Sequence, residues 1–377
     1  MRREDRAVVG LLGFLHGAVH ANLLAIPVFL NLPWRSEFQA NSVVVGLLAA
    51  TTYACFGFSS VPFGFLADRR SPTRLLMLSA GGIAVSLGSL GLSPNLPWLA
   101  LSLAGLGLSS GIYHPTALAA ISRSVEAQGA AMGWHGMGGS LGIALGPAFV
   151  AATLASGWPW RDAVAVLVLP PLVGLALLAT RFPPVGTRPP AVVATPSRSL
   201  ASVSFVRVLL VYFFAGIAYQ GALSFLPLPR FLGGGLFAVA LGLGAVGQVV
   251  AGTLADRRRP DRILTSLSLT AAVLLSLLAA FLGSAAFLVG GLAFGFVLFS
   301  LEALQNTLVT RTAPHESRGL AFGLSFFSVF GLGSIGAVLA GWLLDQGQPA
   351  AMFLVLSAAI ASSGVIAYGI GATVEKT

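Results

Sequence analysis

Five ionisable side chains stand inside long apolar stretches of the chain, where few other polar groups occur: His16, His20, His114, His135 and Glu302. Histidine binds and releases a proton near neutral pH without any special environment. A glutamate in apolar surroundings can take up a proton and so lose a charge that is costly to bury. We therefore expect Glu302 and one of the histidines to bind and release a proton within an apolar interior.

The histidines also allow a second chemistry. His16 and His20 are four residues apart, so both side chains share one face if the segment is helical. With His114 they could supply three imidazole ligands to a zinc ion. No carboxylate or thiolate lies near them in sequence, and Cys55 is the only cysteine. We therefore expect no metal ion and no other cofactor. A histidine that only hydrogen-bonds a backbone carbonyl of a neighbouring helix is the plainer alternative.

The composition indicates that lipid surrounds most of the chain. Of its 377 residues, 56% are hydrophobic and only 9% are charged, with a mean hydropathy of +0.89. Soluble globular proteins carry about a quarter charged residues. The net charge of +9 comes from arginines in short clusters between apolar runs, so we expect no nucleic-acid partner. Lys376 is the only lysine, which excludes a phosphate-binding P-loop. No catalytic motif stands in a suitable context, so the sequence does not predict an enzyme.

Twelve apolar stretches are long enough to cross a bilayer, whose hydrocarbon core of about 30 Å takes roughly 20 helical residues. Backbone polar groups in lipid must be satisfied within each segment, so helices are expected throughout. Turn-forming residues separate the stretches. The expected fold is an all-α membrane protein with spans at 8–30, 43–67, 74–93, 97–120, 128–154, 161–180, 206–229, 233–255, 262–283, 285–310, 317–343 and 349–371.

The arginines predict the orientation of these spans. Of the 21 lysines and arginines, only Arg35, Arg161 and Arg230 fall between spans on the side opposite the N-terminus. Loops rich in positive charge stay on the cytoplasmic side of a membrane. We therefore expect a multi-pass protein of the cytoplasmic (inner) membrane with both termini in the cytoplasm.

The two halves of the chain repeat one another. The residues Leu-Ala-Asp-Arg-Arg at 66–70 recur at 254–258, an offset of 188, and Arg123 matches Arg311 at the same offset. His114 and Glu302 are related by this offset as well. Internal repeats are common in transporters. We expect two pseudo-symmetric six-helix bundles, residues 1–180 and 206–377, joined by a proline-rich cytoplasmic linker at 181–205.

A loop motif in each half resembles a known family. The pattern Gly-x-Leu-Ala-Asp-Arg at 64–69, repeated at 252–257, resembles the loop signature of the major facilitator superfamily. Ser71 and Pro72 depart from the glycine and basic residues with which that signature continues. The resemblance implies ion pairs and helix-end contacts that close the cytoplasmic face, while a plain topogenic charge cluster is the alternative. The implied gate residues are Asp68, Arg69, Asp256 and Arg257.

A second motif lies in the fifth expected span. Gly133, Gly142, Gly146 and Pro147 resemble the glycine-rich motif of the antiporter branches of the superfamily, although Val150 departs from its last glycines. The same glycines could simply allow close helix packing. With Tyr113 and His114 in the fourth span, the motif is also similar to efflux proteins of the fosmidomycin-resistance type.

The resemblance implies a central cavity lined by spans 1, 4, 7 and 10. His135, on span 5, falls outside this set. The repeat places His114 and Glu302 on opposite walls of the cavity. The expected cavity residues are His16, His20, Tyr113, His114, His135, Tyr212, Tyr219, Gln220, Glu302, Gln305 and Asn306.

The function that these features favour is secondary active transport of a small molecule by alternating access, most simply proton-coupled efflux. A proton-coupled symporter or a uniporter for a small metabolite is the alternative. No arginine lies clearly mid-membrane, which disfavours uptake of organic anions. The expected partners are a small-molecule substrate, protons and the lipid bilayer, with the chain acting as a monomer.

Overall fold

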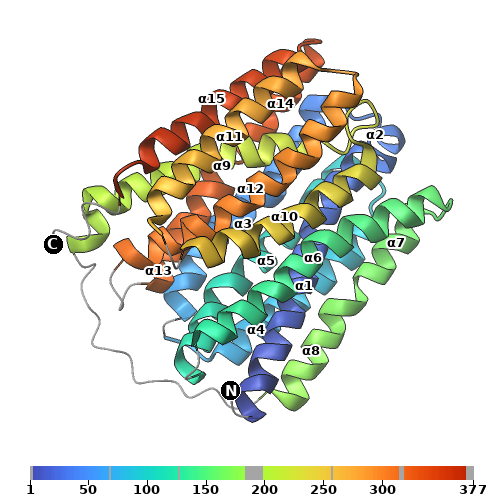
Figure 1. Cartoon of the computed structure of the whole chain (residues 1–377). Helices are drawn as coiled ribbons and strands as arrows, with labels where there is room; N and C mark the ends of the chain where they lie inside the picture. Colours follow the sequence, from blue (N-terminus) through green and yellow to red (C-terminus); the bar gives the residue numbers. More distant parts are fainter. Residues whose placement is uncertain are drawn as a thin grey trace.

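A computed structural model describes residues 3–67, 69–125, 128–182, 198–255, 258–313 and 318–370. Within this part of the chain every regular element is helical, and 12 helical segments are long and apolar enough to cross a membrane. The predicted all-α fold with twelve spans is confirmed. The segments lie side by side as a bundle, in which α1 begins and α15 ends at the same end (Figure 1).

The first half of the chain supplies six spans. Its elements are α1 (Arg3–Asn31), α2 (Pro33–Glu37), α3 (Ser42–Ala67), α4 (Pro72–Gly91), α5 (Leu96–Ser124), α6 (Gln128–Ala155), α7 (Trp160–Leu167) and α8 (Leu169–Arg181). The short helix α2 follows the first span without crossing. Helices α7 and α8 together make the sixth span. The break between them precedes Pro170 and Pro171, whose missing N–H groups interrupt helical hydrogen bonding.

The second half supplies the other six spans. Its elements are η1 (Arg198–Ala201), α9 (Val203–Phe225), α10 (Gly233–Ala255), α11 (Pro260–Ala280), α12 (Ala285–Thr312), α13 (Arg318–Phe326), η3 (Phe327–Leu332), α14 (Ile335–Asp345) and α15 (Pro349–Ala367). Most of the expected linker, residues 183–197, lies outside the described residues.

Local sequence signals begin and end these helices. Asn95, Ser202 and Ser284 are N-cap residues whose side chains accept hydrogen bonds from backbone N–H groups of α5, α9 and α12. Proline occupies the first turn of α4, α11 and α15, where no N–H donor is needed. Gly157 and Gly347 adopt positive φ in the turns before α7 and α15, a conformation that suits glycine.

The seventh and eleventh spans differ from the helices expected at 206–229 and 317–343. Helix α9 ends at Phe225 rather than at 229, because Pro227 and Pro229 cannot donate the hydrogen bonds that would extend it. The eleventh span is long enough to cross the membrane as a single segment, but it is not a regular α-helix throughout. The π-helical segment η3 separates α13 from α14. Short π-helical segments occur frequently at functional sites.

Helices from each half pack mainly within that half, and a few pairs join the halves. In the first half α1 packs on α6 and α3 on α5, while in the second half α10 packs on α12 and α11 on α15. Across the halves, α3 packs on α13, η3 and α14, and α6 packs on α10. In Figure 1 the blue-to-green helices of the first half therefore lie beside the yellow-to-red helices of the second half.

The contact between α1 and α6 is a backbone contact. A β-carbon added at Gly17 would lie 2.9 Å from the carbonyl oxygen of Gly138, and one at Gly142 would overlap the backbone of Gly17. Small residues let transmembrane helices approach this closely. The packing fixes the face that α1 turns to α6, and that face carries His16.

Candidate functional site

A pocket lies where α1 of the first half meets the second half, and it is enclosed mainly by α9, α12, α13 and η3. Most of its wall is aromatic or aliphatic, and a few polar side chains interrupt it, which is typical of small-molecule sites. The lining residues are His20, Tyr212, Ala215, Tyr219, Leu298, Phe299, Leu301, Glu302, Gln305, Asn306, Phe326, Val329 and Phe330.

The polar groups of the second-half wall come from α9 and α12. Glu302, Gln305 and Asn306 lie within one turn and a half of α12, and Tyr212 donates a 2.9 Å hydrogen bond to Oδ1 of Asn306. The Nε2 group of Gln305 is buried without a hydrogen-bond partner. Among the described residues the Glu302 carboxylate has neither an ion-pair nor a hydrogen-bond partner. This wall therefore offers an acid and an amide that a ligand could engage.

One expected cavity residue of α9 does not line the pocket. Gln220 is fully buried, and neither its amide oxygen nor its amide nitrogen has a hydrogen-bond partner in the described structure. Tyr219, its neighbour in sequence, does line the pocket and packs edge-on against Phe299. On a helix, adjacent residues point in directions about 100° apart, so the position of Tyr219 in the pocket does not by itself bring Gln220 there.

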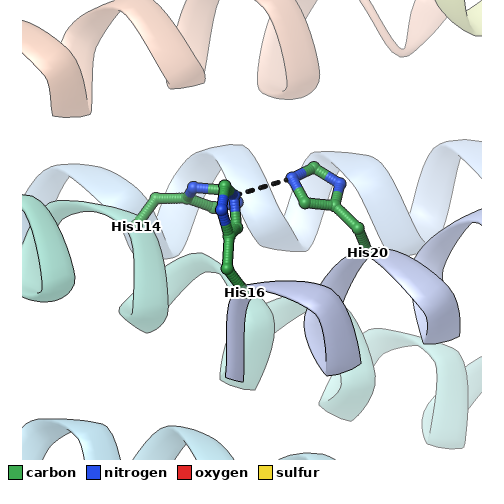
Figure 2. Close-up of side chains that lie close together, drawn as sticks. All are labelled: His16, His20 and His114. Carbon is green, nitrogen blue, oxygen red and sulfur yellow. Dashed lines mark hydrogen bonds between the residues drawn. The ribbon is translucent and has the colours of Figure 1, made fainter. Parts of the chain in front are cut away.

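The histidines of the first half form a cluster. His16 and His20 extend from α1 and His114 from α5, and their rings converge (Figure 2). The Nε2 atoms of His16 and His20 are 3.0 Å apart, and ring centroids lie 4.9 Å apart for His16 and His114 and 5.2 Å apart for His20 and His114. All three side chains are buried. The structure thus brings these three side chains together, and their part in a functional site stays a prediction.

His135 and Tyr113 extend this cluster towards α6. The His135 ring stacks on that of His16 with centroids 4.1 Å apart, and its backbone carbonyl accepts a 2.9 Å hydrogen bond from Nδ1 of His16. The Tyr113 hydroxyl lies 3.1 Å from Nε2 of His135 and donates to the carbonyl of Leu12. Although α6 is outside the set of cavity helices, its histidine thus supports the ring that α1 presents.

His114 and Glu302 are not direct neighbours across the pocket. His20, rather than His114, lines the pocket with Glu302. The rings of Phe56 and Phe326 pack against His114 with centroids 5.6 and 5.2 Å away. Their symmetry-related sequence positions therefore do not bring both side chains into the pocket, and aromatic rings stand beside His114 instead.

The glycine-rich motif of α6 is a packing surface over most of its length. Gly142 and Gly146 face the backbone of α1, where an added β-carbon would overlap Gly17 and Ala21. Gly133 has no atom within 4 Å of such a β-carbon. Pro147 lies inside the helix. The motif therefore combines two residues that the fold requires with one that the packing does not explain.

Of the four expected gate residues, Asp68, Asp256 and Arg257 lie outside the described residues. Arg69 is described, and its guanidinium carbon lies 3.6 Å from the centroid of the Phe65 ring. This cation–π contact holds the arginine against the end of α3. The expected gate thus stays a prediction.

At the opposite end of the bundle, contacts that the sequence did not suggest join the halves. The carboxylate of Asp345, at the end of α14, accepts hydrogen bonds of 2.8 Å from the backbone N–H groups of both Ser42 and Val43. These N–H groups belong to the first two residues of α3, so the negative carboxylate also interacts favourably with the positive end of the helix dipole. Nearby, Asn31 donates a 2.5 Å hydrogen bond to the carbonyl of Ser224. These hydrogen bonds join the two halves at this end of the bundle.

Comparisons with known proteins agree with this arrangement. The family model described as Major Facilitator Superfamily matches residues 9–337. The chain is 27% identical over 337 residues to the multidrug resistance protein MdtG of Enterobacter lignolyticus, covering 82% of this chain and 78% of that protein. It is 27% identical to MdtG of Klebsiella pneumoniae, covering 86% of this chain and 83% of that protein.

Solved structures share the fold at low sequence identity. A bacterial homolog of the human lysosomal transporter Spinster, in an inward-facing and unoccupied conformation, has a TM-score of 0.71 and 18% identity and covers 99% of this chain and 97% of that chain. A POT family transporter in complex with a thioalcohol-conjugated peptide has a TM-score of 0.77 and 14% identity, with coverage of 97% and 96%. The twelve-span fold, the pocket between its halves and the family match together place this chain in the major facilitator superfamily of secondary transporters, which are not enzymes.

Proposed function

We propose that this chain exports small amphipathic molecules across the cytoplasmic membrane in exchange for protons. The pocket carries the proposal, because its wall is aromatic and aliphatic apart from one carboxylate and a few neutral polar groups. Such a lining suits ligands that bury rings and alkyl groups and present few polar atoms. The multidrug resistance proteins named MdtG, which are similar over most of the chain, support efflux as the direction.

Glu302 is the residue to which we assign proton coupling. A carboxylate in an apolar, membrane-embedded wall is costly while charged, and an intramembrane acid is by default a candidate for function. The groups that share its pocket are the hydroxyls of Tyr212 and Tyr219, the amides of Gln305 and Asn306, and the imidazole of His20. None of them is a fixed positive charge. Uptake of a proton would remove the charge of the wall and release a bound cationic or polar cargo.

The conformational cycle follows from the arrangement of the two halves. We assign residues 1–180 and 206–377 to two units that rock about the pocket, with 181–205 as the cytoplasmic linker. Asp68, Arg69, Asp256 and Arg257 would hold the cytoplasmic end closed in one state. The contacts of Asp345 and Asn31 would hold the other end closed in the alternate state. The chain would work as a monomer with both termini in the cytoplasm, as the arginine distribution predicts.

Transport in proteoliposomes tests the exchange directly. Purified protein is reconstituted in vesicles that contain a pH-sensitive dye, a panel of amphipathic compounds is added, and a pH gradient is imposed or omitted. Antiport predicts that compound movement drives protons in the opposite direction and that an imposed gradient drives uphill accumulation. Proton movement in the same direction as the compound would support symport and overturn the proposal. Protein-free vesicles give the background leak of each compound.

A further inference from the structure

The clustered histidines carry a second binding chemistry. His16, His20 and His114 each offer a ring nitrogen, and the three nitrogens lie within 4.8 Å of one another. We propose that these three residues bind one divalent transition-metal ion of the zinc class. Imidazole nitrogens suit zinc, cobalt, nickel and copper, whereas magnesium and calcium prefer oxygen ligands. The expectation of no metal rested on sequence neighbours, and the fold supplies the third ligand from another helix.

The ring orientation of His16 follows from its support. Its Nδ1 atom lies 2.9 Å from the carbonyl oxygen of His135. A carbonyl oxygen only accepts hydrogen bonds, so Nδ1 carries the proton of the neutral ring and Nε2 presents a lone pair. Metal-binding histidines generally donate their other ring N–H to such a group, which fixes the tautomer. His16 is therefore oriented as a ligand.

The His16 Nε2 lone pair points at His20. The two Nε2 atoms are 3.0 Å apart. Two nitrogens bound to one tetrahedral zinc ion at about 2.0–2.1 Å lie roughly 3.3 Å apart, so this pair already has nearly the spacing of two edge ligands. Without an ion, His20 must donate its Nε2–H to His16, and the Nδ1 atom of His20 is then left buried without a hydrogen-bond partner. An ion between the Nε2 atoms would return the proton to Nδ1.

The surroundings suit an ion with an open coordination position. His114 closes the cluster from α5, and its ring stands edge-on to that of His16. His20 also lines the pocket, so the fourth position would face the space that the two halves share. Glu302, the carboxylate of that pocket, lies in the other half and would offset the positive charge of the ion. Three histidines with one open position are a known zinc arrangement.

Metal binding to the purified protein tests this proposal without any transport. Full-length protein carrying a histidine-free affinity tag is washed with chelator and dialysed against Zn²⁺, and bound metal is measured by elemental analysis. One zinc ion per chain is expected. Titration with Co²⁺ should give the visible absorption of cobalt with nitrogen ligands in a four- or five-coordinate site. Absence of bound zinc in the wild-type protein would overturn the proposal.

Substitutions then assign the ligands. His20→Gln and His114→Gln should each weaken zinc binding at least tenfold, because each removes one of three ligands. His315→Gln is the matched control, since it also replaces a histidine but not one of the three proposed ligands. Zinc binding that survives both ligand substitutions would place the ion elsewhere. Wild-type cobalt spectra decide the question if a variant fails to fold. A negative result here leaves proton exchange untouched, since that exchange is assigned to Glu302 and is measured without metal.

Discussion

The His16 ring occupies space that Gly139 leaves free on α6. A β-carbon at position 139 would lie 2.6 Å from Nδ1 and 2.9 Å from Nε2 of His16. Contacts below 3 Å are not tolerated, so any other residue at 139 would move the ring. The orientation of a side chain on α1 thus depends on the absence of a side chain on α6.

We expect Gly139→Ala to displace the His16 imidazole and break its hydrogen bond to the carbonyl of His135. Overpacking of this kind costs about 1–3 kcal/mol, which should lower the thermal unfolding temperature in detergent. Zinc binding should weaken as well. Gly136→Ala is the matched control, because a β-carbon there would have nothing within 4 Å. Equal behaviour of the two variants would show that the ring does not depend on Gly139.

Replacement of Glu302 tests its role as the coupling acid. Glu302→Gln keeps the size of the side chain but cannot bind or release a proton. We expect compound efflux against a pH gradient to be lost in proteoliposomes, while exchange of compound down its own gradient persists. Gln305→Glu is an informative companion, since it places an acid on the same wall of the pocket. Transport that keeps its pH dependence in Glu302→Gln would refute the assignment.

Two substitutions in the glycine-rich segment of α6 distinguish a role in helix packing from a role in transport. Gly142→Ala places a methyl group against the backbone of Gly17, so we expect a loss of about 1–3 kcal/mol in stability and less folded protein in the membrane. Gly133→Ala meets nothing within 4 Å and should fold normally. Fluorescence size-exclusion profiles and proton exchange check both variants. Lost antiport in a well-folded Gly133→Ala protein would show that this position serves transport rather than packing.

Sequence reasoning located the histidines but not what holds them. The spacing of His16 and His20 predicts a shared helix face, and the structure brings His114 to the same place. The place of His135 depends on the rotation of α6 about its own axis. That helix is apolar on every side, so its hydrophobicity has no periodicity from which the rotation could be read. Gly139 gives no signal by itself, because its role is defined by a ring on another helix.

Contacts between residues that are far apart in the chain could not be predicted from the sequence either. Asp345 contacts the start of α3, where its partner Ser42 is 303 positions away in the sequence. From the sequence alone, an acid at the end of an apolar span looks like an ordinary loop residue. The eleventh span contains no proline, so nothing in its sequence predicts the interruption by η3. Helix existence and order followed from apolar runs alone. Helix rotation, backbone irregularity and pairing between the halves follow from packing, which a single sequence does not display.

Asp345→Asn should weaken the contact by which α14 and α3 join the two halves of the bundle, and so increase access to the pocket from that end. The carboxylate binds two backbone N–H groups of α3, and a neutral amide would bind them more weakly, since charge-assisted hydrogen bonds are roughly twice as strong as neutral ones. A cysteine at Leu298, which lines the pocket, reports access when Cys55 is replaced by serine. Its reaction with a membrane-impermeant maleimide should be faster in Asp345→Asn. Asp162→Asn, a change outside this contact, serves as the control.

The ion pair between Glu37 and Arg161 should make stability depend on acid pH. Burial alone would raise the pKa of Glu37, but hydrogen bonds from Arg161 at 2.8 Å and from Trp160 at 2.5 Å bring its pKa below the usual value. A lowered pKa in the folded state adds stability above the unfolded value of about 4.3, and that stability is lost as the pH falls through the folded value.

Wild-type protein should therefore be more stable than Glu37→Gln at pH 7, by at most about 1 kcal/mol for a pair this exposed. The difference should shrink as the pH is lowered from about 5 to 3, through the range in which Glu37 is protonated. Thermal unfolding of both proteins in detergent across that range measures it. Arg161→Gln should reduce this pH dependence without abolishing it, because the hydrogen bond from Trp160 to Glu37 remains. A stability difference that stays constant down to pH 3 would mean that the charge of Glu37 contributes nothing.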